Sequence, residues 1–481
     1  MLSVARRHSL AEALEAHRAI SLAKAIEARR CQATCGLLAR ASIRGVTENT
    51  TPAPKPQLRR ALTLGGAIAI GLSSMIGAGV FSAFGPAAQA AGSALLIGLT
   101  LAFIVAACNA TSTAQLAAQY PTSGGSYIYG REQLGHWWGF VAGWGFVVGK
   151  SASAAAMALT FAAYAAPEAW LKPVALAALV ALIALNSFGI TRTAGAARII
   201  VALVLTGLAG ILSTAWVLEG ASPTGAQALI AGLDEQLATP AGWYGVLQSA
   251  GLLFFAFAGY ARIATLGEEV REPERNIPRA IITTLLVVAV LYALVALTLL
   301  SRLGSGGVAA SSAPLADAVR DAPWAVTLVQ ITAAIAALGA LLAGIAGVSR
   351  TTLAMARERD LPSALAIVHP GVQVPRVATI VLGMVVALLI LVGDVREVIG
   401  FSSFGVLTYY FVANLAAFTQ QDAHRRYPRW AQVIGMALCG VLVATLPWQS
   451  VVGGLAIFAI GLIGRAIVVR RLSRRAGHFG S

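Results

Sequence analysis

One lysine lies deep inside an apolar segment, where an ionisable side chain is expensive. Lys150 occurs in Gly143-Trp-Gly-Phe-Val-Val-Gly-Lys-Ser-Ala-Ser153, near the middle of the apolar segment 137–166. At that depth in a bilayer its amine cannot easily reach water, and such a residue is a functional candidate by default. Three interpretations stay open: Lys150 exchanges a proton, its ammonium binds an acidic group of a ligand, or it is paired for packing alone.

Other groups that could do chemistry at that depth are scarce. No aspartate or glutamate lies in the middle of an apolar segment, and none of the six histidines does either. A membrane enzyme would need such groups to converge, so this class is not expected. The four cysteines, Cys31, Cys35, Cys108 and Cys439, form neither a disulfide framework nor a zinc set. We expect no metal and no cofactor.

Two apolar segments contain stretches that are poor material for a helix. The first reads Gly71-Leu-Ser-Ser-Met-Ile-Gly-Ala-Gly-Val-Phe81, and the second carries Gly259 in the middle of segment 244–268. Backbone groups inside a bilayer must be paired, so a helix break there has to face a cavity or a ligand. The alternative is that these glycines only pack against neighbouring helices, where glycine is common.

The pair of breaks supports a ligand site. Interrupted helices at the first and sixth positions suggest an inverted repeat with a site at the midplane. The N-termini of half-helices offer free N–H groups and partial positive charge to an anion such as a carboxylate.

The elements that carry these residues are helices that span a membrane. Of 481 residues, 58% are hydrophobic and 11% are charged, far fewer charges than the roughly 25% of soluble domains. Taking about 20 residues per span, we predict an all-α membrane protein with twelve transmembrane helices. The expected spans are 61–91, 94–118, 137–166, 173–190, 199–218, 244–268, 279–300, 323–350, 376–393, 397–419, 430–447 and 449–469.

Basic residues give the orientation. With the N-terminus in the cytoplasm, nearly all loop arginines fall on the cytoplasmic side, and only Lys172, Arg302, Arg320 and Arg396 lie outside. We therefore expect both termini in the cytoplasm and the protein in the plasma membrane, with lipid as its surroundings. The net charge of +15 is a topology signal, so no nucleic-acid partner is expected.

Three regions follow from these patterns. Residues 1–57 are rich in Arg and Ala and are expected to form a disordered cytoplasmic tail, although 10–38 could form a surface helix. Residues 58–420 would form the core of ten helices, and 421–481 the last two helices with a basic cytoplasmic tail.

Several motifs, in this order, resemble the amino acid permeases of the amino acid–polyamine–organocation (APC) superfamily. They are Met75-Ile-Gly-Ala-Gly-Val-Phe81, Tyr120-Pro-Thr-Ser-Gly-Gly-Ser-Tyr127, Phe255-Ala-Phe-Ala-Gly259, the loop Glu268-Glu-Val-Arg-Glu-Pro-Glu-Arg-Asn-Ile-Pro-Arg-Ala280, and Ala354-Met-Ala-Arg-Glu-Arg-Asp-Leu-Pro362. The resemblance implies a five-plus-five inverted repeat with broken helices 1 and 6, and movement of amino acids by alternating access.

The resemblance also implies site residues. It assigns the substrate carboxylate to the break of the first helix, at Ser74, Met75, Gly77, Ala78 and Gly79. It assigns the substrate amine to the backbone of the sixth helix, at Phe255, Ala256 and Ala258 beside Gly259, with the Phe255 ring as a gate over the substrate.

Two residues depart from the family pattern. Some proton-coupled members carry a lysine on the fifth helix, but Thr206 and Gly207 stand there, so Lys150 is the candidate for proton coupling or for an acidic substrate group. Arg262 stands where an acidic residue is often found, which favours a neutral, anionic or small zwitterionic amino acid over a cationic one. Arg262 could also pair with Glu268 or Glu269 in a cytoplasmic gate, or be purely structural.

We therefore expect a secondary transporter that moves amino acids, coupled to protons. Sodium coupling is less favoured because the eighth segment has no hydroxyl between Thr332 and Ser349. The alternatives are an exchanger of amino acids or polyamines without proton coupling, and a sensor or channel-like protein that does not transport.

Overall fold

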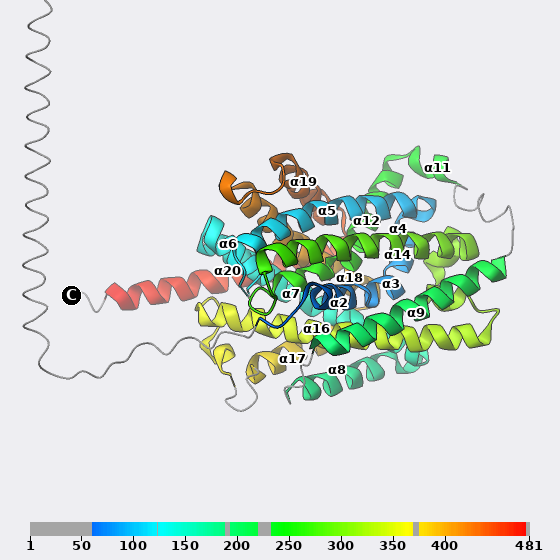
Figure 1. The fold of residues 1–481 in the computed structure, drawn as a ribbon, viewed down its shortest axis with the longest axis horizontal. Helices are drawn as coiled ribbons and strands as arrows, with labels where there is room; N and C mark the ends of the chain where they lie inside the picture. The colour runs from blue at the N-terminus through cyan, green and yellow to red at the C-terminus, as the bar shows by residue number, and fades with distance from the viewer. Residues whose placement is uncertain (1–59, 123, 188–192, 220–231, 369–374, 478–481) are drawn as a thin grey trace, which may run out of the picture. The chain divides into compact units, whose positions relative to one another are not determined.

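The chain is helical throughout the part that the structure describes. A computed structural model describes residues 60–122, 124–187, 193–219, 232–368 and 375–477 (Figure 1). In these residues, ten helical stretches are long and apolar enough to cross a bilayer, and two shorter apolar helices accompany them: α17 (Arg376–Val392) and α19 (Arg429–Thr445). The predicted tail at 1–57 and the last four residues of the predicted C-terminal tail lie outside the described residues.

The other helices follow in chain order. They are α2 (Leu64–Met75), α3 (Ala78–Ser82), α4 (Phe84–Ala91), α5 (Leu95–Gln119), α6 (Ser126–Leu134), α7 (His136–Ala165), α8 (Leu171–Ser187), α9 (Thr193–Glu219), α11 (Leu233–Leu237), α12 (Pro240–Phe257), α13 (Ala261–Ala264), α14 (Pro273–Ala310), α15 (Pro314–Asp317), α16 (Pro323–Arg357), α18 (Val395–Phe418) and α20 (Trp448–Gly477).

Several boundaries differ from the predicted ones. Both α14 and α16 run past the predicted spans 279–300 and 323–350. A kink at Gly304 (φ 64°) allows the outer end of α14 to continue in a new direction. The short polar helix α6 was not predicted, because it has no apolar periodicity and a hydropathy pattern detects only the spans.

Glycines allow α7 and α18 to pack closely against each other. A Cβ placed on Gly149 would lie 2.9 Å from the Val406 nitrogen and 3.0 Å from the Ser402 carbonyl oxygen. The Ser402 hydroxyl donates to the Gly149 carbonyl (2.9 Å) and lies 2.7 Å from the Ser153 hydroxyl. Small residues let membrane helices approach until their backbones touch, and this contact fixes the position of the next residue, Lys150.

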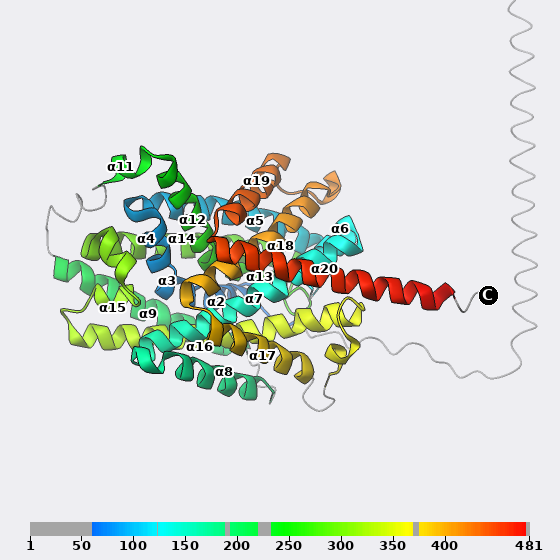
Figure 2. The same cartoon turned by 180° about the vertical axis from the view of Figure 1, so that it is seen from behind.

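The arrangement of the outer helices agrees between two opposite views. In Figures 1 and 2, α8 and α17 pack beside α16 at one edge of the bundle, while α19 lies at the opposite edge. The broken helix formed by α2 and α3 lies between these edges, and it contacts α7, α12, α14 and α16.

Polar contacts close one end of the bundle. Leu62 and Val270 form a parallel β-bridge, in which the Leu62 nitrogen donates to the Glu269 carbonyl (2.9 Å). The Arg350 guanidinium pairs with the Glu269 carboxylate at 2.8 Å. These contacts hold the chain just before the first broken helix to the loop after the second broken helix and to the end of α16. This is the structural role of the acidic loop motif.

A second group of contacts ties α20 to the same end. The buried Asp360 carboxylate lies 2.7 Å from Arg465 Nη1, and the Tyr127 hydroxyl donates to it at 2.8 Å. Burial, together with the negative charge of Asp360, raises the pKa of the Tyr127 phenol, so it stays protonated and can donate. The contacts of Asp360 with Arg465 and Tyr127 give the aspartate of the Asp-Leu-Pro motif a structural role. They hold the turn beyond α16 against α6 and α20.

Candidate functional site

The first membrane helix is interrupted where its glycine-rich stretch lies. Helix α2 begins at the N-cap Thr63, whose hydroxyl accepts from the Gly66 nitrogen at 3.4 Å, and ends at Met75. Ile76 (ψ 67°) and Gly77 (φ −126°, ψ −131°) leave the helical region, and α3 begins at Ala78. The first N–H groups of a new helix have no partner within it, so the break exposes donors inside the bundle.

The sixth helix is interrupted less sharply. A 3₁₀ turn at Ala258–Tyr260 joins α12 to the short helix α13, so the chain continues with tightened geometry. A short 3₁₀ stretch within a helix often marks a functional hinge. The interruption predicted at Gly259 is therefore present as a single changed turn.

Tyr292 joins the two interruptions. Its hydroxyl, on the buried face of α14, lies 2.6 Å from the Met75 carbonyl oxygen and 3.1 Å from the Ala256 carbonyl oxygen. Both carbonyls lie in the last turn of a helix, where backbone donors become scarce, and the single hydroxyl proton can be donated to either of them. The sequence analysis did not identify Tyr292, although a lone tyrosine hydroxyl within an apolar span does indicate a buried partner.

Glycines bring the broken helices into direct contact. A Cβ on Gly79 would lie 2.6 Å from the Cα and Cβ atoms of Ala256, and a Cβ on Gly259 would lie 2.5 Å from the Ser74 carbonyl oxygen. On the other side of the break, a Cβ on Gly77 would meet Ala340 of α16 at 2.6 Å. These distances leave no room for a side chain, so the glycines predicted to bind a ligand also determine how closely the helices pack.

Tyr292→Phe is expected to destabilise the protein by about 1–3 kcal/mol, because the two buried carbonyls lose the one hydroxyl proton that they share while the ring is kept. The measurement is thermal unfolding in detergent. Tyr244→Phe is the matched control, since Tyr244 is exposed and its hydroxyl has no hydrogen bond among the described residues. Equal unfolding temperatures for the two variants would contradict a role for Tyr292 in joining the broken helices.

Lys150 reaches the second interruption. The close packing of α7 on α18 holds its backbone, and its Nζ donates to the Ala258 carbonyl oxygen at 3.0 Å. No carboxylate pairs with Lys150 among the described residues. A carbonyl partner satisfies one of its three donors, which leaves the others directed to the adjoining cavity.

Four predicted residues line one cavity of about 40 Å³: Ser74, Lys150, Gly259 and Arg262. Its remaining wall comes from α7 and α16, including Ala340, Gly344 and Gly347 of α16, which sequence reasoning did not single out. Their close spacing along α16 is the signal that could have found them. At about 10–15 Å³ for each water, the space holds about three water molecules, so the described conformation is too tight for an amino acid. The other predicted site residues do not line it: Met75, Gly77, Ala78, Gly79, Phe255, Ala256, Ala258 and Glu268.

Arg262 faces the same cavity from the inner part of the sixth helix. Its Nη1 donates to the Thr265 hydroxyl at 3.0 Å and lies beside Gly347 of α16. Glu269, one of the carboxylates considered as its partner, pairs with Arg350. In the described chain Arg262 therefore lines the cavity. The contacts that close the end of the bundle are made instead by the Arg350–Glu269 pair and the β-bridge.

The charges around the cavity fit an anionic or zwitterionic ligand. Among the described residues, Lys150 and Arg262 are the only ionisable side chains in its wall, and no described carboxylate there neutralises either of them. The Ser74 hydroxyl has no hydrogen-bond partner among the described residues, so it is free to contact a ligand. No cluster of three or more His, Cys, Asp or Glu side chains that could hold a metal occurs in the described part of the chain.

Residues 62–467 match the amino acid permease family. The chain belongs to that family, which is part of the APC superfamily. It is therefore a multi-pass membrane transporter of amino acids and not an enzyme. Because the match runs through the described spans, it covers every residue of the cavity.

Relatives of known name support the assignment. The permease is 51% identical over 434 residues to an uncharacterized transporter of Mycobacterium tuberculosis, a match that covers 88% of this chain and 96% of the relative. It is 26% identical to a branched-chain amino acid permease of Bacillus subtilis, covering 84% and 92% of the two chains. A cationic amino acid transporter of Arabidopsis thaliana is 25% identical, covering 83% and 72%.

Proposed function

We propose that this permease carries neutral or small zwitterionic amino acids by alternating access and that proton movement drives it. The observation that carries the proposal is that Ser74, Lys150 and Gly259, from three different spans, line one cavity where the interrupted helices meet. A solute bound there would touch both broken helices, so a change in their relative position would change its access to each side.

The substrate carboxylate would bind the break of the first helix. The free N–H groups at the start of α3, from Gly77 to Gly79, favour an anion, and the Ser74 hydroxyl supplies a further donor. Met75 and Ala78 would contribute backbone there, as the family resemblance implies. The cavity must widen before an amino acid fits, which an alternating-access transporter does as it opens.

The substrate amine would bind backbone oxygens of the sixth helix, at Phe255, Ala256 and Ala258, and the Phe255 ring would act as gate. In the described conformation Lys150 already donates to the Ala258 oxygen. One carbonyl is thus shared by the lysine and by the proposed amine position. Binding of substrate and protonation of Lys150 would then be linked through that atom, and such linkage is reciprocal.

Arg262 and Glu268 would act in a cytoplasmic gate. Arg262 lies where the cavity approaches the closed end of the bundle, and Glu268 precedes the residue that pairs with Arg350. Opening toward the cytoplasm would require the Arg350–Glu269 pair and the neighbouring β-bridge to separate.

The orientation and topology also belong to the proposal. Arginines gather at the end of the bundle that carries the β-bridge, while Arg396 contacts Gln89 near the opposite end (2.8 Å). By the positive-inside rule, this bias supports an orientation in which the arginine-rich end and both termini would face the cytoplasm. The two short helices have 17 residues each, about 25 Å of helix, which nearly spans a hydrocarbon core. If both cross, the chain would cross the plasma membrane twelve times.

No carboxylate is found among the described residues of the cavity wall, which favours a neutral substrate over a cationic one. This agrees with the Bacillus subtilis relative, whose name assigns it branched-chain amino acids, more than with the Arabidopsis thaliana relative, whose name assigns it cationic ones. An acidic substrate would gain from Lys150 and Arg262, so aspartate and glutamate belong in the test panel.

Uptake by purified protein in proteoliposomes tests the function. Labelled leucine, alanine, glutamate and lysine are offered with and without an imposed pH gradient. We expect saturable uptake of a neutral amino acid, several-fold faster with an acidic exterior, and counterflow against unlabelled substrate. Counterflow at the same rate with and without the pH gradient, and no acceleration of uptake by the gradient, would indicate an uncoupled exchanger. Flux without counterflow would indicate a channel, and neither uptake nor counterflow would indicate a sensor.

A further inference from the structure

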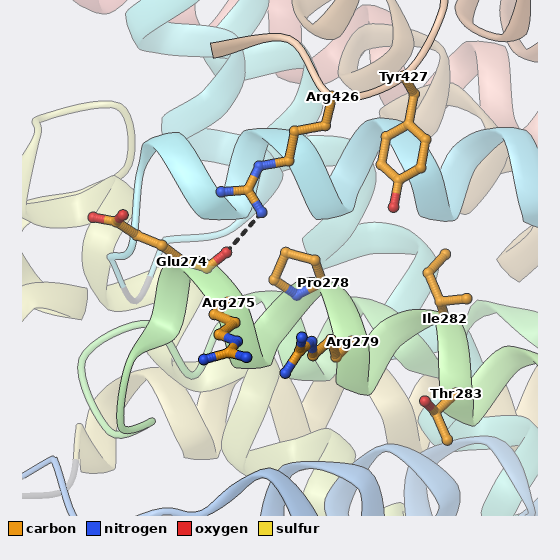
Figure 3. Close-up of a pocket in the computed structure, with 8 residues that line it drawn as sticks. All are labelled: Glu274, Arg275, Pro278, Arg279, Ile282, Thr283, Arg426 and Tyr427. Atoms are coloured by element: carbon orange, nitrogen blue, oxygen red, sulfur yellow. Dashed lines mark hydrogen bonds between the residues drawn. The ribbon is translucent and has the colours of Figure 1, made fainter.

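A second, larger pocket opens at the basic end of the bundle, away from the cavity. It has a volume of about 610 Å³ and lies between the first turns of α14 and the segment before α19 (Figure 3). Its walls are formed by three basic residues and one acidic residue together with apolar and polar ones: Arg275, Arg279, Arg426, Glu274, Pro278, Ile282, Thr283 and Tyr427. The substrate proposal uses none of these residues.

The pocket gathers three arginines that form no ion pair with any described residue, although Glu274 also lines it. Arg275 and Arg279 lie one turn apart on α14, both exposed, and neither has an ion pair among the described residues. Arg426 Nη1 donates to the main-chain carbonyl of Glu274 at 2.9 Å, which orients its guanidinium over the pocket. In Figure 3 the Glu274 carboxylate points away from the three guanidinium groups. Guanidinium groups arranged in this way suit the paired oxygens of a phosphate.

An apolar stripe continues from the pocket along the same helix. Beyond Ile282, which is half-buried, the side chains of Leu286, Val290 and Leu294 are exposed on α14, with Val290 at 63%. The spacing of these residues, close to one helical turn, keeps them on the face that begins with Arg275 and Arg279. Charge at the end of a span, followed by apolar surface, matches a phospholipid headgroup followed by its acyl chains.

We propose that this pocket binds the phosphate headgroup of an anionic phospholipid in the leaflet at the basic end. Arg275, Arg279 and Arg426 contact the phosphate oxygens, Tyr427 contacts the glycerol region from the side of α19, and the acyl chains lie along the stripe on α14. The apolar continuation favours lipid over a soluble phosphate, since a free ion would gain nothing from the stripe. The bound lipid joins the start of α14 to the loop before α19.

Native mass spectrometry of the detergent-solubilised permease with phosphatidylglycerol and phosphatidylcholine tests this site. We expect wild type to retain phosphatidylglycerol preferentially, and the triple variant Arg275→Gln, Arg279→Gln, Arg426→Gln to lose at least tenfold in affinity for it. The matched control is Arg271→Gln, Arg357→Gln, Arg359→Gln, which removes the same charge from exposed positions at the same end. It should bind like wild type.

Two outcomes would overturn the proposal. Equal loss in both triple variants would mean that general charge attracts the lipid and that the pocket is not its site. Competition by soluble glycerophosphoglycerol or inorganic phosphate at concentrations close to that of the lipid would identify a free phosphate as the ligand. Thermal unfolding without lipid checks folding: both variants should match wild type, and only the pocket variant should lose stabilisation by added phosphatidylglycerol.

Discussion

Lys150→Ala is expected to abolish the part of amino acid uptake that a pH gradient drives, a loss of at least tenfold in initial rate. Lys150 and Arg262 are the only ionisable groups that the described part of the chain contributes to the cavity wall, and arginine gives up its proton far less readily than lysine. Lys150 is thus the group there that can exchange a proton, and its bond to the Ala258 oxygen connects it to the sixth helix. The measurement is uptake into proteoliposomes with an imposed gradient.

Counterflow without a gradient separates the roles that remain open for Lys150. If the lysine couples protons, the alanine variant should keep counterflow of neutral amino acids while losing gradient-driven accumulation. If it binds an acidic side chain, the variant should lose glutamate selectively and respond to the gradient as before. Lys172→Ala is the control, because Lys172 is an exposed lysine outside the cavity wall, where it donates to the Leu391 carbonyl (2.7 Å). Unchanged coupling in Lys150→Ala would refute the proton role.

The sequence predicted the existence of the helices well, because every membrane-spanning helix must pair its own backbone groups and be apolar on the outside. A bilayer pairs no backbone groups, so every crossing appears as a long apolar run whose existence is visible without the fold. The ends were less predictable. Helix α14 runs beyond its apolar run to Pro273 and Ala310, since polar residues outside the membrane can continue a helix at little cost.

The cavity was predicted in part, and the difference has a physical reason. Lys150 and Arg262 were identified because a charge is unusual at membrane depth. Ser74 and Gly259 were identified because they lie in the helix-breaking stretches, and the four residues do line one cavity. The α16 wall is built from alanine, glycine and one valine, which attract no notice in a membrane helix. Tyr292 was missed for a related reason: its importance lies in which two carbonyls it reaches, and that depends on the packing of three helices.

The glycines show how the structure changes an interpretation. From the sequence, Gly79 was a point in the break where a ligand would approach the backbone. In the fold, the direction in which its Cβ would point is already occupied by Ala256 of the other broken helix. Ligand binding and helix contact therefore depend on the same residue, and a substitution there affects both.

Gly79→Leu is expected to abolish substrate binding while the protein still inserts into the membrane. The new Cβ would lie 2.6 Å from the Ala256 backbone and 3.3 Å from the Tyr292 hydroxyl, so α12 must move away from α3. Overpacking of this kind costs about 1–3 kcal/mol, which a protein of many spans can tolerate. The substrate site cannot tolerate it, because displacing α12 separates the two backbones that would hold one amino acid. Binding is measured with labelled substrate on detergent-purified protein.

Gly79→Ala distinguishes contact between helices from simple filling of the break. Since the clash begins at Cβ, alanine should weaken binding at least tenfold, nearly as much as leucine, whereas a break that only needs space would accept a single methyl group. Gly440→Leu is the control, because a Cβ on Gly440 meets no atom within 4 Å, and it should bind substrate like wild type. Normal binding by Gly79→Ala would show that α3 and α12 need not touch for the site to form, and the proposed joint site would then have to be abandoned.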